Sequence, residues 1–295
     1  MNYIEHSDLV IDQWNQLVEE KQAEIFSYSW YLDACTDHWA VLVDDAFENG
    51  IAIGYVTKLG QRLISPPIFV RNLDFIGEDL NFRKKALDYI MQHFQFGHLQ
   101  SVQEWPLQSQ KQRVFQQVED DVALGSQAKR MIQKARKLGF EIVVTEDWKS
   151  VLAIIREELS AKISEFTSEN LSRLHNLVSN LALNQRLTCF GIFSDGKLEG
   201  GMFFMETNTK RMYLKGAARK LTRDSGGMYL CMHHAIQEAI QAQKKFDFGG
   251  SEVEGVRRFN QNLGGIDQHY YIYDWNKTPF WFKWSKQLYQ QWKKK

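Results

Sequence analysis

The chain has 295 residues, of which 44% are hydrophobic and 24% charged, and its 36 basic and 36 acidic side chains cancel. This composition excludes a disordered chain, and the length allows one large or two medium domains. Zero net charge gives the whole molecule no attraction to nucleic acid or membranes, so any basic binding site must be local. The longest apolar runs are too short to cross a bilayer, and we expect no membrane span.

The N-terminal residues and the cysteines indicate a cytoplasmic protein. Residues 1–6 have neither the basic stretch nor the apolar core of a secretory signal. The three cysteines, at positions 35, 189 and 231, are odd in number and widely spaced. We therefore expect buried thiols in a reducing compartment, with no disulfide frame and no zinc site. The adjacent His233 and His234 diverge on a helix, so they cannot hold one metal ion together.

The first half of the chain predicts strands and helices in alternation. The expected strands are 3–6, 39–44, 51–58, 62–70 and 98–105, and the expected helices are 9–21, 30–37 and 81–94. The turn residues Glu48-Asn49-Gly50 join two apolar runs as a hairpin. Pro66-Pro67 interrupts the strand over 62–70, because proline has no N–H for the ladder.

The second half gives a clearer order. The expected strands are 140–145, 188–193, 198–205, 211–216, 245–250 and 269–273, and the expected helices are 126–138, 147–160, 168–184, 225–243 and 252–262. The pair Asp195-Gly196 between two apolar runs predicts a tight hairpin. A final helix over 279–292 has one broad apolar face, which either closes the protein's own core or docks on a partner.

The resulting order is β-α-α-β-β-β-α-β-α-β, and the first half repeats it. A three-strand meander followed by a β-α-β crossover predicts an α/β fold with a mixed sheet and helices on both faces. We therefore expect two tandem units, 1–125 and 126–295, joined within 106–139.

That element order is the one seen in GNAT-type N-acyltransferases, and two such units resemble the Fem-type (FemAB/FemX-like) aminoacyl transferases and the Fem-like acetyltransferases. The run from Lys245 to Gly265 is similar to the Fem-type signature, in which a Tyr/Phe-Asp-Phe-Gly-Gly strand end precedes a helix carrying Phe-Lys and a Phe-Gly-Gly close. Residues 126–140 are similar to the family's basic helix. Departures are Phe259-Asn260 for Phe-Lys and Leu263 for the aromatic residue. Residues 139–188 are too few for the long helical hairpin with which some Fem proteins contact tRNA.

The resemblance places an acyl-CoA donor between the fourth and fifth strands of the second unit. The first N–H groups of the helix near 225 suit a pyrophosphate, since they lack intrahelical partners. The expected donor-binding residues are Gly216, Ala217, Arg219, Arg223, Ser225, Gly226, Gly227 and Met228. Arg223 and Gly226 match the GNAT loop Arg/Gln-x-x-Gly-x-Gly/Ala, with Met228 where Gly or Ala is expected. The alternative is that Asp224 or Ser225 merely caps a helix.

Direct transfer requires the donor carbonyl and the acceptor amine in line, charge stabilisation and a route for a proton. Backbone N–H groups around Lys215–Ala217 are candidate oxyanion donors, and Lys215 is a candidate for neutralising the developing charge. Asp247, at a strand end beside two glycines, is the second candidate catalytic residue. Its alternative role is to bond neighbouring backbone N–H groups and shape the turn.

The acceptor is expected in the loop and helix after Asp247. The candidate residues are Gly249, Gly250, Ser251, Arg258 and Phe259. Arg258 either binds an anionic substrate or forms a solvated salt bridge. The basic helix around Lys129–Lys137 either meets RNA or an anionic lipid head, or is an ordinary amphipathic helix with a solvated face.

We therefore hypothesise an N-acyltransferase that moves an acyl group from acyl-CoA to an amine of a small molecule or peptide, without a metal. The first unit then forms part of the acceptor cleft. One alternative is an aminoacyl-tRNA-dependent Fem-type transferase with tRNA as partner. Another is a catalytically inactive GNAT-like unit that serves as a binding module.

Overall fold

The computed structural model describes residues 1–107, 110–119, 123–160, 167–250 and 253–278. The chain divides into two compact units. Unit 1 comprises Met1–Gln112 together with the described residues from Tyr270 onward, and unit 2 comprises Arg113–His269. Residues 113–125 thus go with the second unit, and the last described strand enters the first. The sequence boundary after residue 125 assigned both segments the other way.

Unit 1 contains a mixed sheet with strand order β1-β2-β3-β4-β5-β12. The elements are β1 Asn2–Glu5, η1 His6–Asp8, α1 Ile11–Glu20, η2 Ile25–Ser27, α2 Ser29–Cys35, β2 Trp39–Val43, β3 Gly50–Lys58, β4 Gln61–Ile64, α3 Leu80–His93, β5 Phe96–Ser101 and β12 Ile266–Asn276. Pairing is antiparallel except between β4 and β5. The expected hairpin at residues 48–50 is confirmed, since β2 and β3 pair across it.

Both faces of the unit 1 sheet are covered. On one face α3 contributes Phe82 and Ile90 to a cluster with Leu42 and Ile53. On the other face Trp14 of α1 is fully buried, and the missing side chain of Gly50 leaves room for its ring. Strand β2 is buried at every residue, as expected for a strand between two helical layers.

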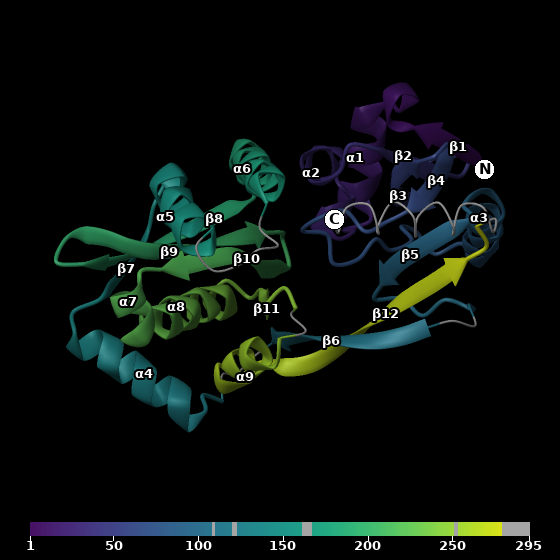
Figure 1. Ribbon diagram of the computed structural model, residues 1–295. Coiled ribbons are helices and arrows are strands. Elements are labelled where there is room, and N and C mark those ends of the chain that lie inside the picture. Colours follow the sequence, from purple (N-terminus) through teal and green to yellow (C-terminus); the bar gives the residue numbers. More distant parts are fainter. Residues whose placement is uncertain (108–109, 120–122, 161–166, 251–252, 279–295) are drawn as a thin grey trace, which may run out of the picture. The chain divides into compact units, whose positions relative to one another are not determined.

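Unit 2 contains a second mixed sheet with strand order β6-β11-β10-β9-β8-β7 (Figure 1). The elements are β6 Gln110–Val118, α4 Ser126–Lys137, β7 Glu141–Val144, α5 Trp148–Ser160, α6 Ser168–Leu183, β8 Leu187–Ser194, β9 Lys197–Glu206, β10 Lys210–Ala218, α7 Lys220–Asp224, α8 Gly227–Gln241, β11 Lys245–Asp247 and α9 Glu254–Asn262. Only β10 and β11 pair in parallel.

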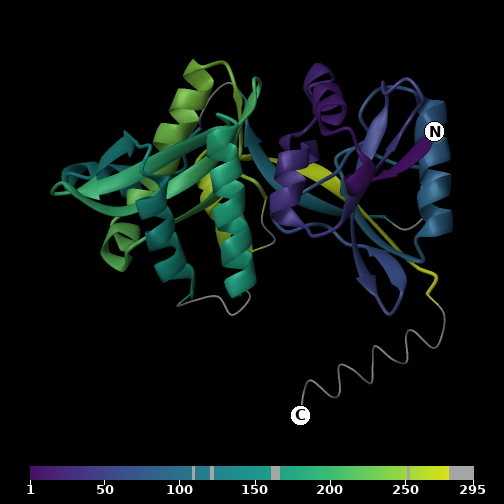
Figure 2. The ribbon, with the colours of Figure 1, turned by 90° about the horizontal axis from the view of Figure 1, so that it is seen from above.

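Helices flank both faces of this sheet: α4 and α8 lie on one face, and α5 and α6 on the other (Figures 1 and 2). On the α8 side, Ala128 and Ile132 of α4 join Cys231 and Ile236 of α8 and Phe190 of β8 in one buried cluster. The predicted α/β architecture, a mixed sheet with helices on both faces in each unit, is confirmed.

Most expected elements are present within a few residues, and the exceptions have local causes. Strand β4 ends before Pro66, and β11 ends at Asp247, because Gly249 and Gly250 turn the chain with φ of +80° and +85°. Strand β6 and helix α7 were not expected. The helix expected over 279–292 lies outside the described residues.

The expected burial of the cysteines is confirmed, and none of Cys35, Cys189 and Cys231 forms a disulfide. Within the described residues, no helix combines the length and the apolarity that a membrane span requires.

Candidate functional site

Strands β10 and β11 pair over a short distance and then part. The parallel register ends where Met212 lies opposite Asp247, whereas β10 continues to Ala218. A β-bulge between Tyr213 and Lys215 shifts the register of β10 against β9, and a bulge bends and twists the strand that carries it. The outer half of β10 therefore extends beyond its pairing with β11.

Lys215 and Asp247 project from the same face of the sheet. Lys215 lies opposite Phe203 of β9, and directly opposite residues share a face. Gly201, two residues before Phe203, leaves room for a side chain of α5, so this is the α5 face. Phe246 packs in the cluster on the α8 side. Asp247, the next residue of the strand, therefore points to the α5 face as well.

The carboxylate of Asp247 is fully buried and holds the turn that follows its strand. Its Oδ1 accepts a hydrogen bond from the backbone N–H of Gly249 at 2.8 Å, and its Oδ2 accepts one from Nε2 of Gln117 at 2.9 Å. The side chain is 0% exposed. These bonds tie β11, its turn and β6 together, and they favour the turn-shaping role over that of a proton acceptor.

Lys215 lies near the bulge with its side chain largely withdrawn from water. Burial lowers the pKa of the Lys215 amine, because a low-dielectric environment disfavours the charged form. Neighbouring Gly216 lies partly buried and Ala217 buried on the same strand. The structure thus brings together a perturbed amine and the backbone of residues 215–217, the stretch that the sequence singled out.

The glycines before α8 are packed against protein. Gly226 is the N-cap of α8 with φ of +90°, and a β-carbon there would lie 2.9 Å from the carbonyl carbon of Met131 in α4 and nearer still to its oxygen. A β-carbon on Gly227 would meet Thr222 of α7 at 2.5 Å. Ser225 is buried beside them. The close approach that these glycines permit in the structure is therefore that of α4 and α7.

The other donor-binding candidates surround this turn. Arg219 lies 3.7 Å from Glu199, and Arg223 donates to Glu158 at 3.0 Å, and both arginines remain partly exposed. Met228 is partly buried against the core cluster on the α8 side. The cationic groups therefore lie at the rim of the turn, and the glycines and Met228 form its packed interior.

The acceptor-side candidates are spread over a turn and a helix. Gly249 and Gly250 form the turn after β11, and Ser251 lies outside the described residues. Arg258 is exposed and pairs with Glu254 one helical turn earlier. This contact agrees with a solvated salt bridge, the alternative to binding an anionic substrate. Phe259 packs on Tyr229 with ring centroids 4.5 Å apart and contributes to the core.

Asn260 occupies the position that is lysine in the Fem signature, and it belongs to a series of hydrogen-bonded side chains that the sequence did not indicate. Asn260 donates to Gln116 at 2.9 Å, and Gln116 donates to Asp267 at 2.8 Å. Asn260 and Gln116 are 2% and 0% exposed. Hydrogen bonding to Arg257 lowers the pKa of Asp267. A neutral amide suits this position, because it satisfies buried partners without burying a charge.

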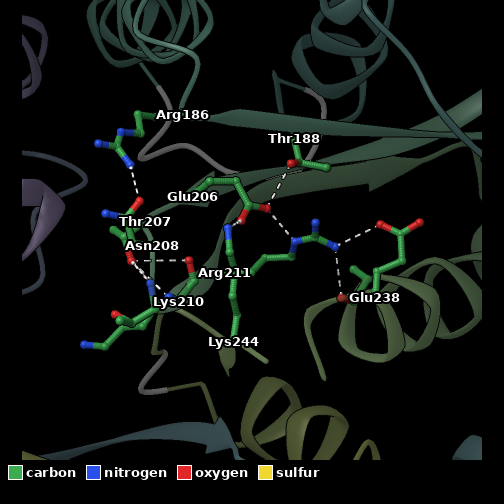
Figure 3. Close-up of polar contacts among 11 residues, drawn as sticks. Arg186, Thr188, Glu206, Thr207, Asn208, Lys210, Arg211, Glu238 and Lys244 are labelled. Atoms are coloured by element: carbon green, nitrogen blue, oxygen red, sulfur yellow. Dashed lines mark hydrogen bonds and ion pairs between the residues drawn. The ribbon is translucent and has the colours of Figure 1, made fainter. Parts of the chain in front are cut away.

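A second polar cluster holds the paired ends of β9, β10 and β11 (Figure 3). Glu206 accepts hydrogen bonds from Thr188 at 2.9 Å, Arg211 at 2.5 Å and Lys244 at 2.7 Å. Arg211 also donates to Glu238 of α8 at 3.1 Å. Glu206 and Arg211 are only 12% and 10% exposed. This cluster joins the start of β10 to β9, to α8 and to the residue before β11, so the strands separate only toward Ala218.

Residues 125–259 match the family model described as an acetyltransferase (GNAT) domain. The structure is similar to that of FemX, with 12% sequence identity, a TM-score of 0.66, and coverage of 94% of this chain and 98% of that one. It is also similar to L-PGS from Bacillus licheniformis, with 14% identity, a TM-score of 0.61, and coverage of 91% and 92%.

A third similar structure is a GNAT-family acetyltransferase from Colwellia psychrerythraea, with 9% identity, a TM-score of 0.52, and coverage of 94% and 100%. The search of curated protein sequences gives no match. At such identities the likeness is one of fold alone. Together with the family match, it confirms the resemblance to tandem GNAT and Fem-type proteins drawn from the sequence.

Proposed function

We propose that this chain is an N-acyltransferase that moves an acyl group directly from acyl-CoA to an amine. The observation that carries the proposal is the parting of β10 from β11 after Met212, next to the N-terminus of α8. In this proposal an extended thioester would lie along the outer half of β10, where backbone groups lie beyond the pairing with β11. The GNAT match over 125–259 includes all of these elements.

In this proposal the anionic end of the donor meets the rim of the turn between α7 and α8. Arg219 and Arg223 are partly exposed there, and Lys220 is exposed between them. The positive end of α8 adds to their attraction for phosphate. Gly226 and Gly227 are packed by α4 and α7, so side-chain cations and not glycine backbone would supply most phosphate contacts.

The chemistry assigned to Lys215 is charge neutralisation. The acceptor nitrogen forms a bond to the thioester carbonyl carbon, the C–S bond breaks, and the proton lost by the nitrogen is taken up by the leaving CoA thiolate. A protonated Lys215 would neutralise the oxyanion formed in between, with backbone N–H groups of residues 215–217 as further donors. Asp247 would then position the turn that borders the acceptor.

Isothermal titration of the full chain with acetyl-CoA, longer acyl-CoAs and free CoA tests the donor. We expect binding of at least one acyl-CoA, and we expect the double change Arg219→Gln and Arg223→Gln to weaken it about tenfold. Arg173→Gln is a matched control, because Arg173 pairs with Glu169 on α6, away from the turn. If neither CoA nor any acyl-CoA binds, the donor assignment fails.

The role of Lys215 is tested by kinetics against pH. Lys215→Met should lower the turnover number about 100-fold, whereas Lys215→Arg should keep much of it, since arginine stays charged. Because burial lowers the pKa of Lys215, the wild-type rate should fall on the alkaline side earlier than for an ordinary lysine. The Lys215→Arg variant should lack that decline. An unchanged alkaline limb in that variant would remove Lys215 from the chemistry.

The resemblance to Fem-type aminoacyl transferases supports a second donor, aminoacyl-tRNA. With that donor, RNA should copurify with the protein and binding should weaken steeply with salt. A chain that binds charged tRNA but no CoA compound would favour this alternative. We place the protein in the cytoplasm, where both donors are made.

A further inference from the structure

Helix α4 presents a dense band of positive charge. Its five cations are exposed, and they extend from the flank of the buried stripe of Ala128, Ile132 and Ala135 to the opposite side of the helix. They are Lys129, Arg130, Lys134, Arg136 and Lys137. The helix contains no acidic residue. In the part of the chain that the structure describes, none of the five forms an ion pair, and Lys134 donates only to the backbone carbonyl of Asp224.

Several arginines of unit 2 are instead neutralised by a partner. Arg173, Arg211 and Arg257 each pair with a carboxylate. From Lys129 to Lys137 the helix rises by about 12 Å, so five unneutralised charges lie within that length. Because the chain as a whole has a net charge of zero, this band would attract an anionic partner to one particular face of the molecule.

Two exposed aliphatic side chains lie on the α4 side of the unit 2 sheet. Leu138, which follows α4, is 52% exposed and lies on the same side of the helix as Lys134, four residues earlier. A β-carbon on the next residue, Gly139, would meet no atom within 4 Å, so the space beside Gly139 is open. Val144 is 58% exposed on β7, the last strand of this sheet, and lies opposite Phe190. It therefore faces the same side as α4.

We propose that the exposed face of α4 docks the protein on a surface of anionic lipid headgroups, with Leu138 and Val144 entering the interface. The lipid phosphates are complementary to the basic band, and cations beside exposed aliphatic side chains suit the boundary between headgroups and acyl chains. The apolar side of α4 is already buried in unit 2. The helix therefore rests on the surface without inserting, and docking is reversible and weakened by salt.

The chemistry of the face favours lipid over nucleic acid. Helix α4 carries no aromatic side chain on which a base could stack. A phosphate backbone would leave the two exposed aliphatic side chains in water. Contact with acyl chains would remove them from water and so stabilise binding. RNA binding would use the cations alone, and this difference separates the two partners experimentally.

The test is sedimentation of the full chain with vesicles of phosphatidylcholine alone and with vesicles that contain about one third phosphatidylglycerol. The charge variant carries Lys129→Gln, Arg130→Gln and Lys137→Gln. The matched control removes the same charge from exposed lysines of unit 1 through Lys58→Gln, Lys84→Gln and Lys85→Gln. Circular dichroism and thermal melting of both variants verify the fold, since all six side chains are exposed.

We expect binding only to the anionic vesicles. Each cation near such a surface contributes about fivefold in affinity, so the charge variant should bind about 100-fold more weakly and the control much less so. Leu138→Ser should weaken vesicle binding about fivefold and leave binding of duplex RNA unchanged. Equal effects of the two charge variants, binding to RNA but not to vesicles, or no effect of Leu138→Ser would each overturn the proposal. Unchanged acyl-CoA binding by the charge variant keeps this result separate from the proposed activity.

Discussion

Replacing Gly226 by alanine separates two explanations for the glycines before α8. Gly226 has φ of +90°, a conformation that costs an L-residue about 1 kcal/mol or more. The added β-carbon would lie 2.9 Å from the carbonyl carbon of Met131 and 3.2 Å from its β-carbon. The nearer atoms belong to the backbone of a helix, so α4 as a whole must shift. Overpacking of this kind costs about 1–3 kcal/mol.

We therefore expect Gly226→Ala to lower the free energy of unfolding by about 2–4 kcal/mol. Gly139→Ala is the matched control, because Gly139, two residues after the end of α4, also has a left-handed conformation, with φ of +73°. Its β-carbon would meet no atom within 4 Å, so only the conformational cost of about 1 kcal/mol applies. Urea unfolding monitored by far-UV circular dichroism measures both losses, with separate transitions fitted if the two units unfold apart.

The difference between the two variants decides the outcome. A loss at Gly226 that exceeds the loss at Gly139 by 1 kcal/mol or more supports packing as the reason for the glycine. Equal losses would refute the packing argument. If Gly226→Ala leaves stability at the level of the control but abolishes acyl-CoA binding, the glycine serves the ligand.

Three further changes test other parts of unit 2. Glu206→Gln removes the negative charge that faces Arg211, which is 10% exposed, and Lys244, which is 22% exposed, and it should cost about 3 kcal/mol of unfolding free energy. Glu254→Gln, in an exposed pair, should cost no more than about 0.5 kcal/mol. Asp247→Asn turns an N–H group toward one of two buried donors and should cost about 1–3 kcal/mol, and unchanged stability would contradict its turn-shaping role. Burial, and secondarily Arg136, lowers the pKa of His233 from its ordinary 6.5, so the unfolded state binds more protons below that pH and stability falls as the pH decreases through it. Arg136→Gln should raise the pKa of His233 in an NMR titration and reduce that acid loss, and an unmoved pKa would contradict the coupling.

Local patterns in the sequence were sufficient to predict most of the fold. The hairpin at Asp195-Gly196 is present, with φ of +50° and +72° at its two residues, because both tolerate the left-handed conformation that a tight turn requires. The apolar period of α6 likewise buries Leu174, Val178 and Leu181. Both features depend only on residues that are close together in the chain, so the local sequence is enough to predict them.

Strand β6 was missed because two of its buried residues, which lie between the apolar Phe115 and Val118, are polar. Gln116 and Gln117 are buried, yet glutamine in a sequence is typical of surface. Their partners, Asn260 and Asp247, lie more than a hundred residues away. Burial of these amides depends on tertiary hydrogen bonds, so no periodicity in Gln110–Val118 could reveal the strand.

The sequence indicated candidate residues, but it could not indicate what each of their side chains contacts. The sequence indicated Lys215, Asp247 and the turn before α8, and the structure places the first two on one face of the sheet. That Asp247 has both oxygens engaged, and that Gly226 faces α4, depends on which element packs opposite. Packing partners of this kind are fixed by the whole fold, and a motif cannot specify them.

The divergence of β10 and β11 is determined by contacts at both ends of their pairing. Arg211 and Lys244 hold the paired ends to Glu206, so the strands cannot separate there. After Met212, the bulge bends β10. The turn at Gly249, whose N–H donates to the carboxylate of Asp247, takes the chain away from the line of β11. Covalent geometry and buried hydrogen bonds set this divergence without any ligand. Little binding free energy would therefore be lost to rearranging the strands when a donor binds along β10. Its affinity should therefore depend on the cations at the rim more than on rearrangement of the sheet.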